Sequence, residues 1–434
     1  MSDQKIARLD AALPDFPEAF DRLLITPSEA DSDLAGVVAG IITEVATEGD
    51  SAVVRFTNRF DDRNVAGMES LQLRDEDVEH AWASIDDGVR HALIHAADRI
   101  RDFHERQLAH SWDYEDPEGN LLGQRVSALD RVGIYVPGGR ASYPSSVLMN
   151  AIPAKVAGVE RLVVVTPTPQ GKTNPLVLAA AHMAGVDEIW RVGGAQAVAA
   201  LAYGTDRIAK VDVITGPGNA WVAEAKRQLF GVVGIDMVAG PSEILVIADK
   251  HNSADWIAAD LLSQAEHDPT SQSILITDDA GFADTVSAQV DAQLVELATC
   301  ETATASWNAN GAIIIVDNVA DAAPLADQLA AEHVELAVAD PEPLLKAIRH
   351  AGSVFLGRMT PEAIGDYVAG PNHVLPTGRR ARFASGLSVL DFMKRTSFIA
   401  LDDASLGRIG PAAVSLAHAE GLPAHAKSVE LRLK

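Results

Sequence analysis

The sequence is poor in cysteine, in basic residues and in long apolar runs. One cysteine, Cys300, among 434 residues excludes an intrachain disulfide and an all-cysteine metal site. The 35 basic residues stand against 61 acidic ones, and the net charge of −26 makes nucleic acid an unsuitable partner. No segment reaches the roughly 18 uninterrupted apolar residues of a membrane span, and no export signal opens the chain. We therefore expect a cytoplasmic protein that does not contact membranes.

The pattern of apolar residues changes near Arg131. Before it, apolar residues recur at helical spacing from Leu34 to Val54 and from Asp75 to His104, so the first hundred residues are mostly helix. After it, short β-rich runs alternate with alanine-rich helical runs, which is typical of parallel, doubly wound sheets. The predicted strands are Val132–Val136, Arg161–Thr166, Glu188–Val192, Val211–Thr215, Glu243–Ala248, Ser271–Thr277 and Ala312–Val316.

These patterns predict an α/β protein with two incomplete Rossmann-like doubly wound units, a helical N-terminal arm and a small C-terminal helical tail. The arm covers residues 1–30. Residues 31–133 plus 243–385 form one α/β domain, which carries the metal and catalytic residues. Residues 134–242 form the second α/β domain, and residues 386–434 form the tail.

Glycine-rich turns follow several predicted strands, where ligands of open α/β sheets bind. They are Pro137-Gly138-Gly139, Gly193-Gly194-Ala195-Gln196, Gly216-Pro217-Gly218-Asn219 and Gly240-Pro241-Ser242-Glu243. Gly218-Asn219 also opens a helix, where free N–H groups favour an anionic group. The dinucleotide fingerprint fails because Trp221 stands where its third glycine would be. Ordinary turn geometry therefore remains an alternative for each of them.

Three stretches carry groups that can transfer protons or bind a metal. Glu332-His333 puts a carboxylate beside an imidazole at the end of an alanine- and leucine-rich helical run. Gln264 and His267 lie three residues apart at the end of an apolar helix, so they share a face, although zinc rarely takes a glutamine oxygen. A Gly/Pro-rich loop holds a further acid and imidazole, Asp366 and His373, and the tail holds Glu420 and His425. Taken alone, an adjacent Glu-His is more often a solvated helix end, and the spacing of Gln264 and His267 more often does not mark a metal site.

Together these motifs resemble the histidinol dehydrogenase family. The resemblance rests on Gly193–Thr205, Gly216–Asn219, Ala239–Glu243, Gln264–Asp268, Ala331–Leu336, Gly370–Gly378 and Glu420–His425, which occur in the family's order from about Ile41 to His425. It implies a zinc- and NAD-dependent enzyme that oxidises L-histidinol through L-histidinaldehyde to L-histidine, the last steps of histidine biosynthesis. It also implies one zinc per subunit and a homodimer whose active sites are completed across the interface by the tail.

The resemblance further implies a role for each matched residue. Glu332 and His333 would be the catalytic proton-transfer pair. The zinc ligands would be Gln264, His267, Asp366 and His425, and the same four residues would contact the substrate together with His333, Ser242, His373 and Glu420. NAD would contact Tyr135, Gln196 and Asn219. Zinc would then act mainly as a template for the substrate.

Two other interpretations stay open at this point. In a zinc hydrolase, zinc and Glu332 would activate water and the glycine turns would only bind an anion, which leaves the paired α/β units without a cofactor. A family relative could use the same machinery to oxidise another amino-alcohol or a sulfonated polyol. A catalytic thiol is not expected, because the neighbours of Cys300 offer no base or cation to stabilise a thiolate. A binding or scaffold protein fits least, because every expected site residue is present.

Overall fold

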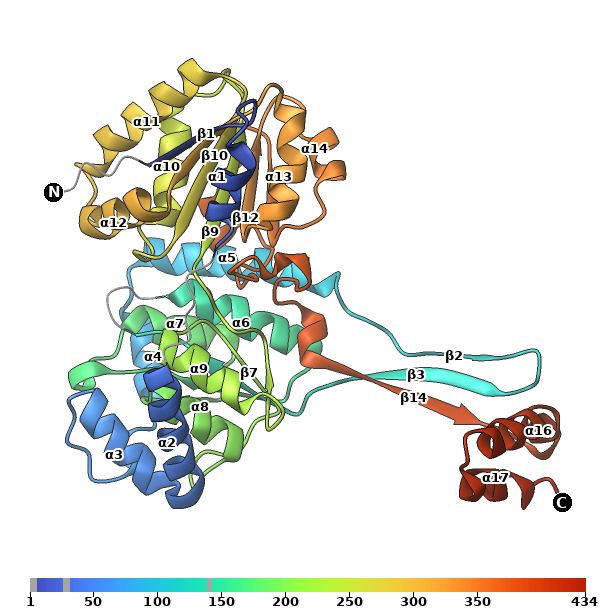
Figure 1. The fold of residues 1–434 in the computed structure, drawn as a ribbon. Coiled ribbons are helices and arrows are strands. Elements are labelled where there is room, and N and C mark those ends of the chain that lie inside the picture. Colours follow the sequence, from blue (N-terminus) through green and yellow to red (C-terminus); the bar gives the residue numbers. More distant parts are fainter. Residues whose placement is uncertain (1–5, 26–31, 139–142) are drawn as a thin grey trace.

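The computed structural model of the chain describes residues 6–25, 32–138 and 143–434. They form two α/β units and a long arm that ends in a pair of helices (Figure 1). Among these residues we find no helix with the length and apolar character needed to span a bilayer. Parts of the predicted N-terminal arm, residues 1–30, and of the turn at Gly138-Gly139 lie outside the described residues.

The first unit is built on a six-stranded parallel sheet. Its order is β1 (Ala7–Asp10), β11 (Ala312–Ile315), β10 (Gln272–Thr277), β9 (Glu243–Ala248), β12 (His333–Ala337) and β13 (Ser353–Leu356). One face packs on α10 (Ala254–Ala265), α11 (Ala280–Leu294) and α12 (Cys300–Asn310). The other packs on α1 (Phe16–Leu23), α13 (Ala322–Leu329) and α14 (Glu342–Ala347). Every residue of β9 is buried, as a central strand covered on both faces requires.

The second unit has a five-stranded parallel sheet. Its order is β6 (Glu188–Trp190), β5 (Arg161–Val165), β4 (Arg131–Tyr135), β7 (Val213–Thr215) and β8 (Gly234–Ile235). One face packs on α4 (Asp75–Ser84), α5 (Asp87–Glu105), α6 (Pro144–Ala157) and α7 (Pro175–Ala184). The other packs on α2 (Ser32–Glu48), α3 (Asp50–Phe60), α8 (Gly194–Tyr203) and α9 (Ala220–Leu229). The predicted fold class and all seven predicted strands are confirmed.

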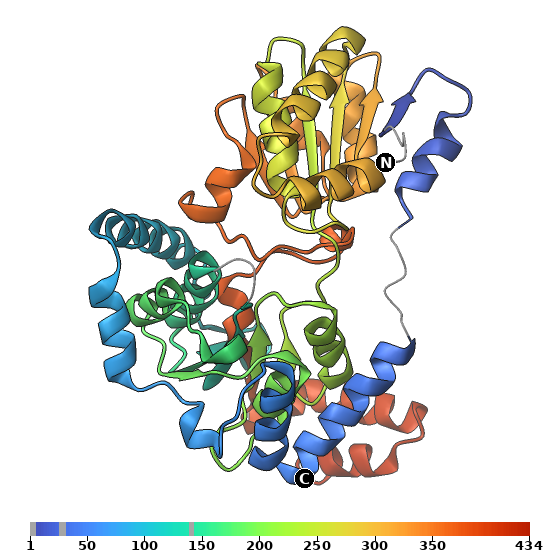
Figure 2. The same cartoon turned by 90° about the vertical axis from the view of Figure 1, so that its left-hand side faces the viewer.

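The packing of the N-terminal third differs from the predicted grouping. Helices α2 to α5 cover the five-stranded sheet, whereas residues 31–133 were expected to join residues 243–385. Conversely, strand β1 of the N-terminal segment pairs with β11 in the six-stranded sheet, and Figure 2 shows this segment beside the first unit. Amphipathic spacing shows which face of a helix is buried but not which sheet it covers, so the sequence pattern could not decide this point.

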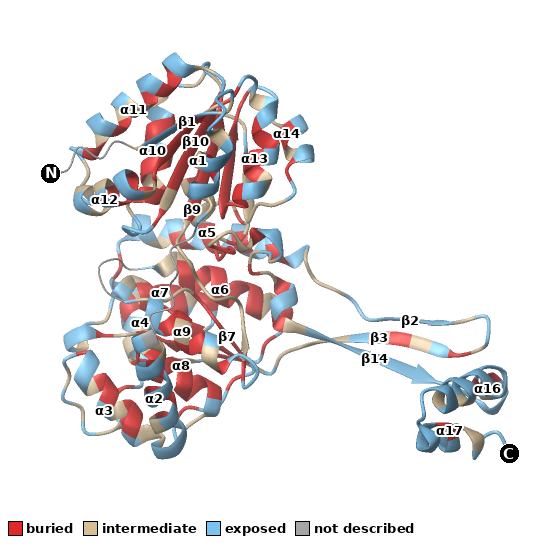
Figure 3. Cartoon of the chain, in the orientation of Figure 1, coloured by how far each residue is buried: buried red, intermediate tan, exposed pale blue. Residues whose placement is uncertain are grey.

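The long arm in Figure 1 is a different segment from the predicted N-terminal arm. It is an antiparallel sheet that the sequence analysis did not predict. Strand β3 (Leu121–Ala128) pairs with β2 (Trp112–Glu115) on one edge and with β14 (Met393–Ala400) on the other. Beyond it the tail folds into α16 (Asp403–Ala419) and α17 (Pro423–Glu430), which lie far from both units in Figure 1. Most of the arm and both helices are exposed, unlike the two cores (Figure 3). Residues 112–128 therefore belong structurally with the tail.

His104 at the end of α5 is fully buried. Its Nδ1 lies 2.7 Å from the carbonyl oxygen of Ile100, and burial lowers the pKa of the imidazole. The folded chain thus binds fewer protons at this site than the unfolded chain below the ordinary histidine pKa of about 6.5. Its contribution to stability is complete above that pH and is lost as the pH falls through the lowered pKa.

We therefore expect the melting temperature to fall less between pH 7 and pH 5 in His104→Gln than in the unchanged protein. Glutamine can retain the bond to Ile100 but does not titrate. His95→Gln is the matched control, since His95 is exposed on the same helix. Equal pH dependence in His104→Gln and the unchanged protein, measured by calorimetry, would contradict this assignment.

Candidate active site

Glu332 and His333 lie at the amino end of the central strands of the six-stranded sheet. Helix α13 ends at Leu329, and Ala330 turns the chain with a left-handed φ of 45°. His333 is then the first residue of β12, in register with Ile244 of β9. The pair therefore belongs to the start of a buried strand, three residues beyond the helical run where the sequence pattern placed it.

The Glu332 carboxylate is buried and accepts two hydrogen bonds from the segment that leads into β9. Its Oε2 accepts from the backbone N–H of Glu243 at 3.1 Å, and the Ser242 side chain also bonds to it. Glu332 is only 6% exposed. Burial raises the pKa of Glu332 well above its ordinary value, and the two donors oppose that rise. A carboxyl group tuned in this direction is a stronger base than a solvated one.

His333 is buried and neutral. Burial lowers its pKa to about 4. Its Nδ1 lies 3.0 Å from Oε1 of Gln264 and 3.3 Å from the carbonyl oxygen of Glu243. Because both neighbours of Nδ1 are acceptors, the hydrogen-bond network assigns the single ring proton to Nδ1. The lone pair of Nε2 is then available to accept a proton.

Three of the residues expected to bind metal gather beside this pair. Gln264 is buried in the last turn of α10, and its Nε2 lies 3.2 Å from Nδ1 of His267 just beyond the helix. Asp366 lies on the short helix α15 (Glu362–Tyr367), not in a loop as predicted, and interacts electrostatically with His267 and His333. The hydrogen bond and the Coulombic interaction with His373 hold the pKa of Asp366 below its usual value, although burial opposes this shift. An ionised carboxylate and an imidazole are ligands that zinc accepts readily, whereas the Gln264 amide oxygen would be an unusual one.

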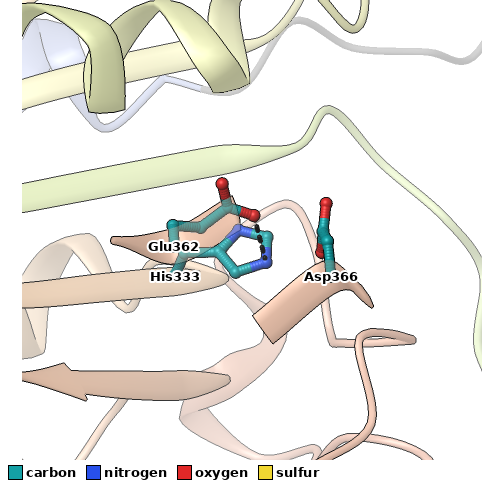
Figure 4. A group of neighbouring side chains, drawn as sticks. All are labelled: His333, Glu362 and Asp366. Atoms are coloured by element: carbon teal, nitrogen blue, oxygen red, sulfur yellow. Dashed lines mark ion pairs between the residues drawn. The ribbon is translucent and has the colours of Figure 1, made fainter. Parts of the chain in front are cut away.

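Glu362 is a site residue that the sequence analysis missed. It is 1% exposed on α15, and its Oε1 lies 3.5 Å from Nε2 of His333 (Figure 4). Ligand atoms of His333, Glu362 and Asp366 lie within 4.8 Å of one another. No hydrogen bond to Oε1 of Glu362 is present among the described residues, which fits a site that receives a cation or substrate. In the sequence, the only indication that Glu362 belongs to the site is its position four residues before Asp366, which puts both carboxylates on one face of a helix.

His373 and Asn372 link this cluster to the five-stranded unit. Nδ1 of His373 lies 3.1 Å from the carbonyl oxygen of Asp366. The neighbouring Asn372 is buried, and its amide donates to the carbonyl of Met149 in α6 at 2.6 Å. His373 therefore sits where the two units meet.

The three residues expected to contact NAD lie on the five-stranded unit. Tyr135 ends β4, and its buried hydroxyl accepts from the Gly194 backbone N–H at 3.0 Å. Asn219, after the neighbouring strand β7, caps α9 through a 3.3 Å bond. Strands β4 and β7 flank the point where the strand order of this sheet reverses. Gln196 is 1% exposed, yet neither atom of its amide has a partner among the described residues. These orphaned atoms fit a bound cofactor.

Glu420 and His425 do not join the cluster within one chain. Glu420 caps the end of α16 and His425 lies in α17, at the tip of the arm in Figure 1. Both are exposed. Helix α16 is held against the β2–β3 hairpin of the same chain, because the Arg408 guanidinium donates to the Glu118 carbonyl at 2.9 Å. A single chain therefore assembles the body of the site without these two residues.

Comparisons with known proteins agree with the motifs. The family model described as histidinol dehydrogenase matches residues 25–433. The chain is 60% identical over 427 residues to histidinol dehydrogenase from Rhodospirillum rubrum, covering 98% of both chains. It is 57% identical over 428 residues to the enzyme of that name from Zymomonas mobilis, covering 99% of both. The crystal structure of histidinol dehydrogenase from Elizabethkingia anophelis matches with a TM-score of 0.93 at 34% identity, covering 100% of this chain and 99% of that one. The chain belongs to the histidinol dehydrogenase family of oxidoreductases.

Proposed function

We propose that this protein oxidises L-histidinol to L-histidine through L-histidinaldehyde, with zinc and two NAD, in the last steps of histidine biosynthesis. The observation that carries the proposal is the gathering of Glu332, His333, Gln264, His267 and Asp366 at the amino end of the six-stranded sheet, in a chain of this family. A cytoplasmic location is part of the proposal, in keeping with the single cysteine.

Gln264, His267 and Asp366, with His425 of the partner subunit, would hold zinc, while Tyr135, Gln196 and Asn219 would contact NAD. When bound, NAD accepts a hydride in each oxidation and zinc orients the amine and imidazole nitrogens of the substrate. Ser242, His373 and Glu420 would complete the substrate site.

The two proton-transfer residues would divide the work. Neutral His333 accepts the proton of the alcohol at Nε2 as the alcohol is oxidised. Glu332, with its raised pKa, takes a proton from the water that attacks the aldehyde carbonyl, and the resulting hydrate is oxidised in the second step. This route needs no thiol, which agrees with the setting of Cys300.

We also propose that the protein is a homodimer in which each tail completes the site of the other subunit. The exposed apolar side chains of the terminal helices support this arrangement: Leu416 is 65% exposed and Leu431 is 56% exposed. A helix pair that leaves such residues in water is expected to bury them against a partner.

The decisive experiment measures NADH formed per L-histidinol consumed by the zinc-loaded protein. We expect two NADH per substrate, loss of activity with a chelator and recovery on adding zinc. Absence of NADH would reject histidinol as the substrate. Other amino-alcohols and sulfonated polyols would then be tested, because a related dehydrogenase could oxidise them with the same residues. Persistent activity in verified metal-free protein would reject the zinc requirement.

A further inference from the structure

Glu243, the first residue of β9, contacts both members of the proton-transfer pair through its backbone. Its N–H donates to Oε2 of Glu332 at 3.1 Å. Its carbonyl oxygen lies 3.3 Å from Nδ1 of His333. The position of the Glu243 backbone therefore helps to set the orientation of the Glu332 carboxylate and the tautomer of His333.

The Glu243 side chain is itself held from a distant part of the chain. It is 5% exposed, and its Oε2 accepts from the backbone N–H of Arg379 at 3.2 Å. Arg379 has a left-handed φ of 61°, a conformation that residues other than glycine rarely adopt. Strained backbone of this kind persists only where the surroundings fix it.

Further contacts fasten the same two segments together. The Thr377 hydroxyl accepts from the Gly240 backbone N–H at 2.6 Å, and the Arg380 guanidinium donates to the Val238 carbonyl at 2.6 Å. Residues 377–380 thus clasp the connection that leads into β9. Of these contacts, the bond between Arg379 and the Glu243 carboxylate is the one made by the residue that itself contacts Glu332 and His333.

We infer that Glu243 is a positioning residue: its carboxylate, held by Arg379, fixes the backbone that orients Glu332 and His333. The inference rests on the proposed function and adds a residue to its machinery. The length of the side chain is then what matters, because a carboxylate one methylene shorter cannot reach Arg379 without moving the backbone. The charge is secondary, because a neutral amide oxygen can accept the same hydrogen bond.

Two conservative substitutions separate position from charge. We expect Glu243→Gln to keep kcat for histidinol within about threefold of the unchanged enzyme. Glu243→Asp should lower kcat by on the order of tenfold to a hundredfold with little change in KM, as a small misplacement of reacting groups does. The opposite order would assign the role to charge and overturn the inference, as would equal loss in both variants or no loss in either.

Glu188 provides the matched control. It opens β6 of the other sheet, where its carboxylate accepts from Arg161 at 2.8 Å, so Glu188→Asp shortens a similar strand-start contact away from the site. We expect its kcat to be unchanged. A loss equal to that of Glu243→Asp would mean that general loosening of a strand start lowers activity, and would overturn the inference.

A measurement without turnover separates this inference from the proposed function. Nitrogen NMR of the His333 ring, assigned with His333→Asn, reports which ring nitrogen carries the proton. We expect Glu243→Gln to preserve the Nδ1–H form and Glu243→Asp to reduce it, even if the unchanged protein yields no NADH from histidinol. An unaltered ring signal in Glu243→Asp would overturn the inference and leave the proposed function untouched.

Discussion

Replacing His333 by asparagine is expected to lower kcat for both L-histidinol and L-histidinaldehyde by on the order of 10²–10⁴-fold. Asparagine preserves polarity at Nδ1, near Gln264 and Glu243, but offers no basic nitrogen in place of Nε2. Initial rates of NADH formation from each substrate measure the effect. Both oxidations should suffer, because each must lose an O–H proton, from the alcohol in the first and from the aldehyde hydrate in the second.

Glu332→Gln should give a different pattern, with aldehyde oxidation slowed more than alcohol oxidation. Only the aldehyde requires an activated water, and a glutamine can still accept the bond from the Glu243 backbone. His251→Asn, beyond the opposite end of β9, is the control and should leave both rates unchanged. If Glu332→Gln slows the two substrates equally, the proposed division between the two residues is wrong.

The strands could be predicted because a buried parallel strand leaves a local signature. Glu243–Ala248 is a short apolar run followed by a helical one, and such runs place strands whatever they pair with. The antiparallel arm left no such signature. Strand β2 is exposed at every position and therefore has no apolar alternation to read.

The site was predictable only where family motifs name its residues. Glu243 and Glu362 were missed because a lone glutamate is usually a solvated surface residue, and only the fold reveals that these two are 5% and 1% exposed. The sequence analysis placed Asp366 and His373 in one loop but predicted neither their contact nor the short helix that carries Asp366. Burial depends on contacts between distant segments, such as Arg379 with Glu243, which no local pattern contains.

Removing the imidazole of His425 is expected to abolish most activity, although α17, which carries His425, lies far from β12, which begins at His333, within one chain (Figure 1). If the tail completes the partner's site, His425→Ala removes one proposed zinc ligand. Zinc content should fall, and a substrate that is no longer held in place should react on the order of 10²-fold more slowly. Metal analysis and NADH formation measure the two effects. His418→Ala on the neighbouring helix, where His418 pairs with Glu430 at 3.2 Å, should change neither.

Mixed dimers then decide which chain supplies the residue. A dimer of one His425→Ala chain and one His333→Ala chain, isolated with two different affinity tags, contains one undamaged site only if the tails are exchanged. In that case the body with an intact His333 receives the intact His425 of its partner, and about half of the normal activity returns. If each tail served its own body, both sites would carry a defect and the mixed dimer would stay inactive. Recovery would therefore also explain why the arm projects so far from its own units: its length would be what carries His425 to the other subunit.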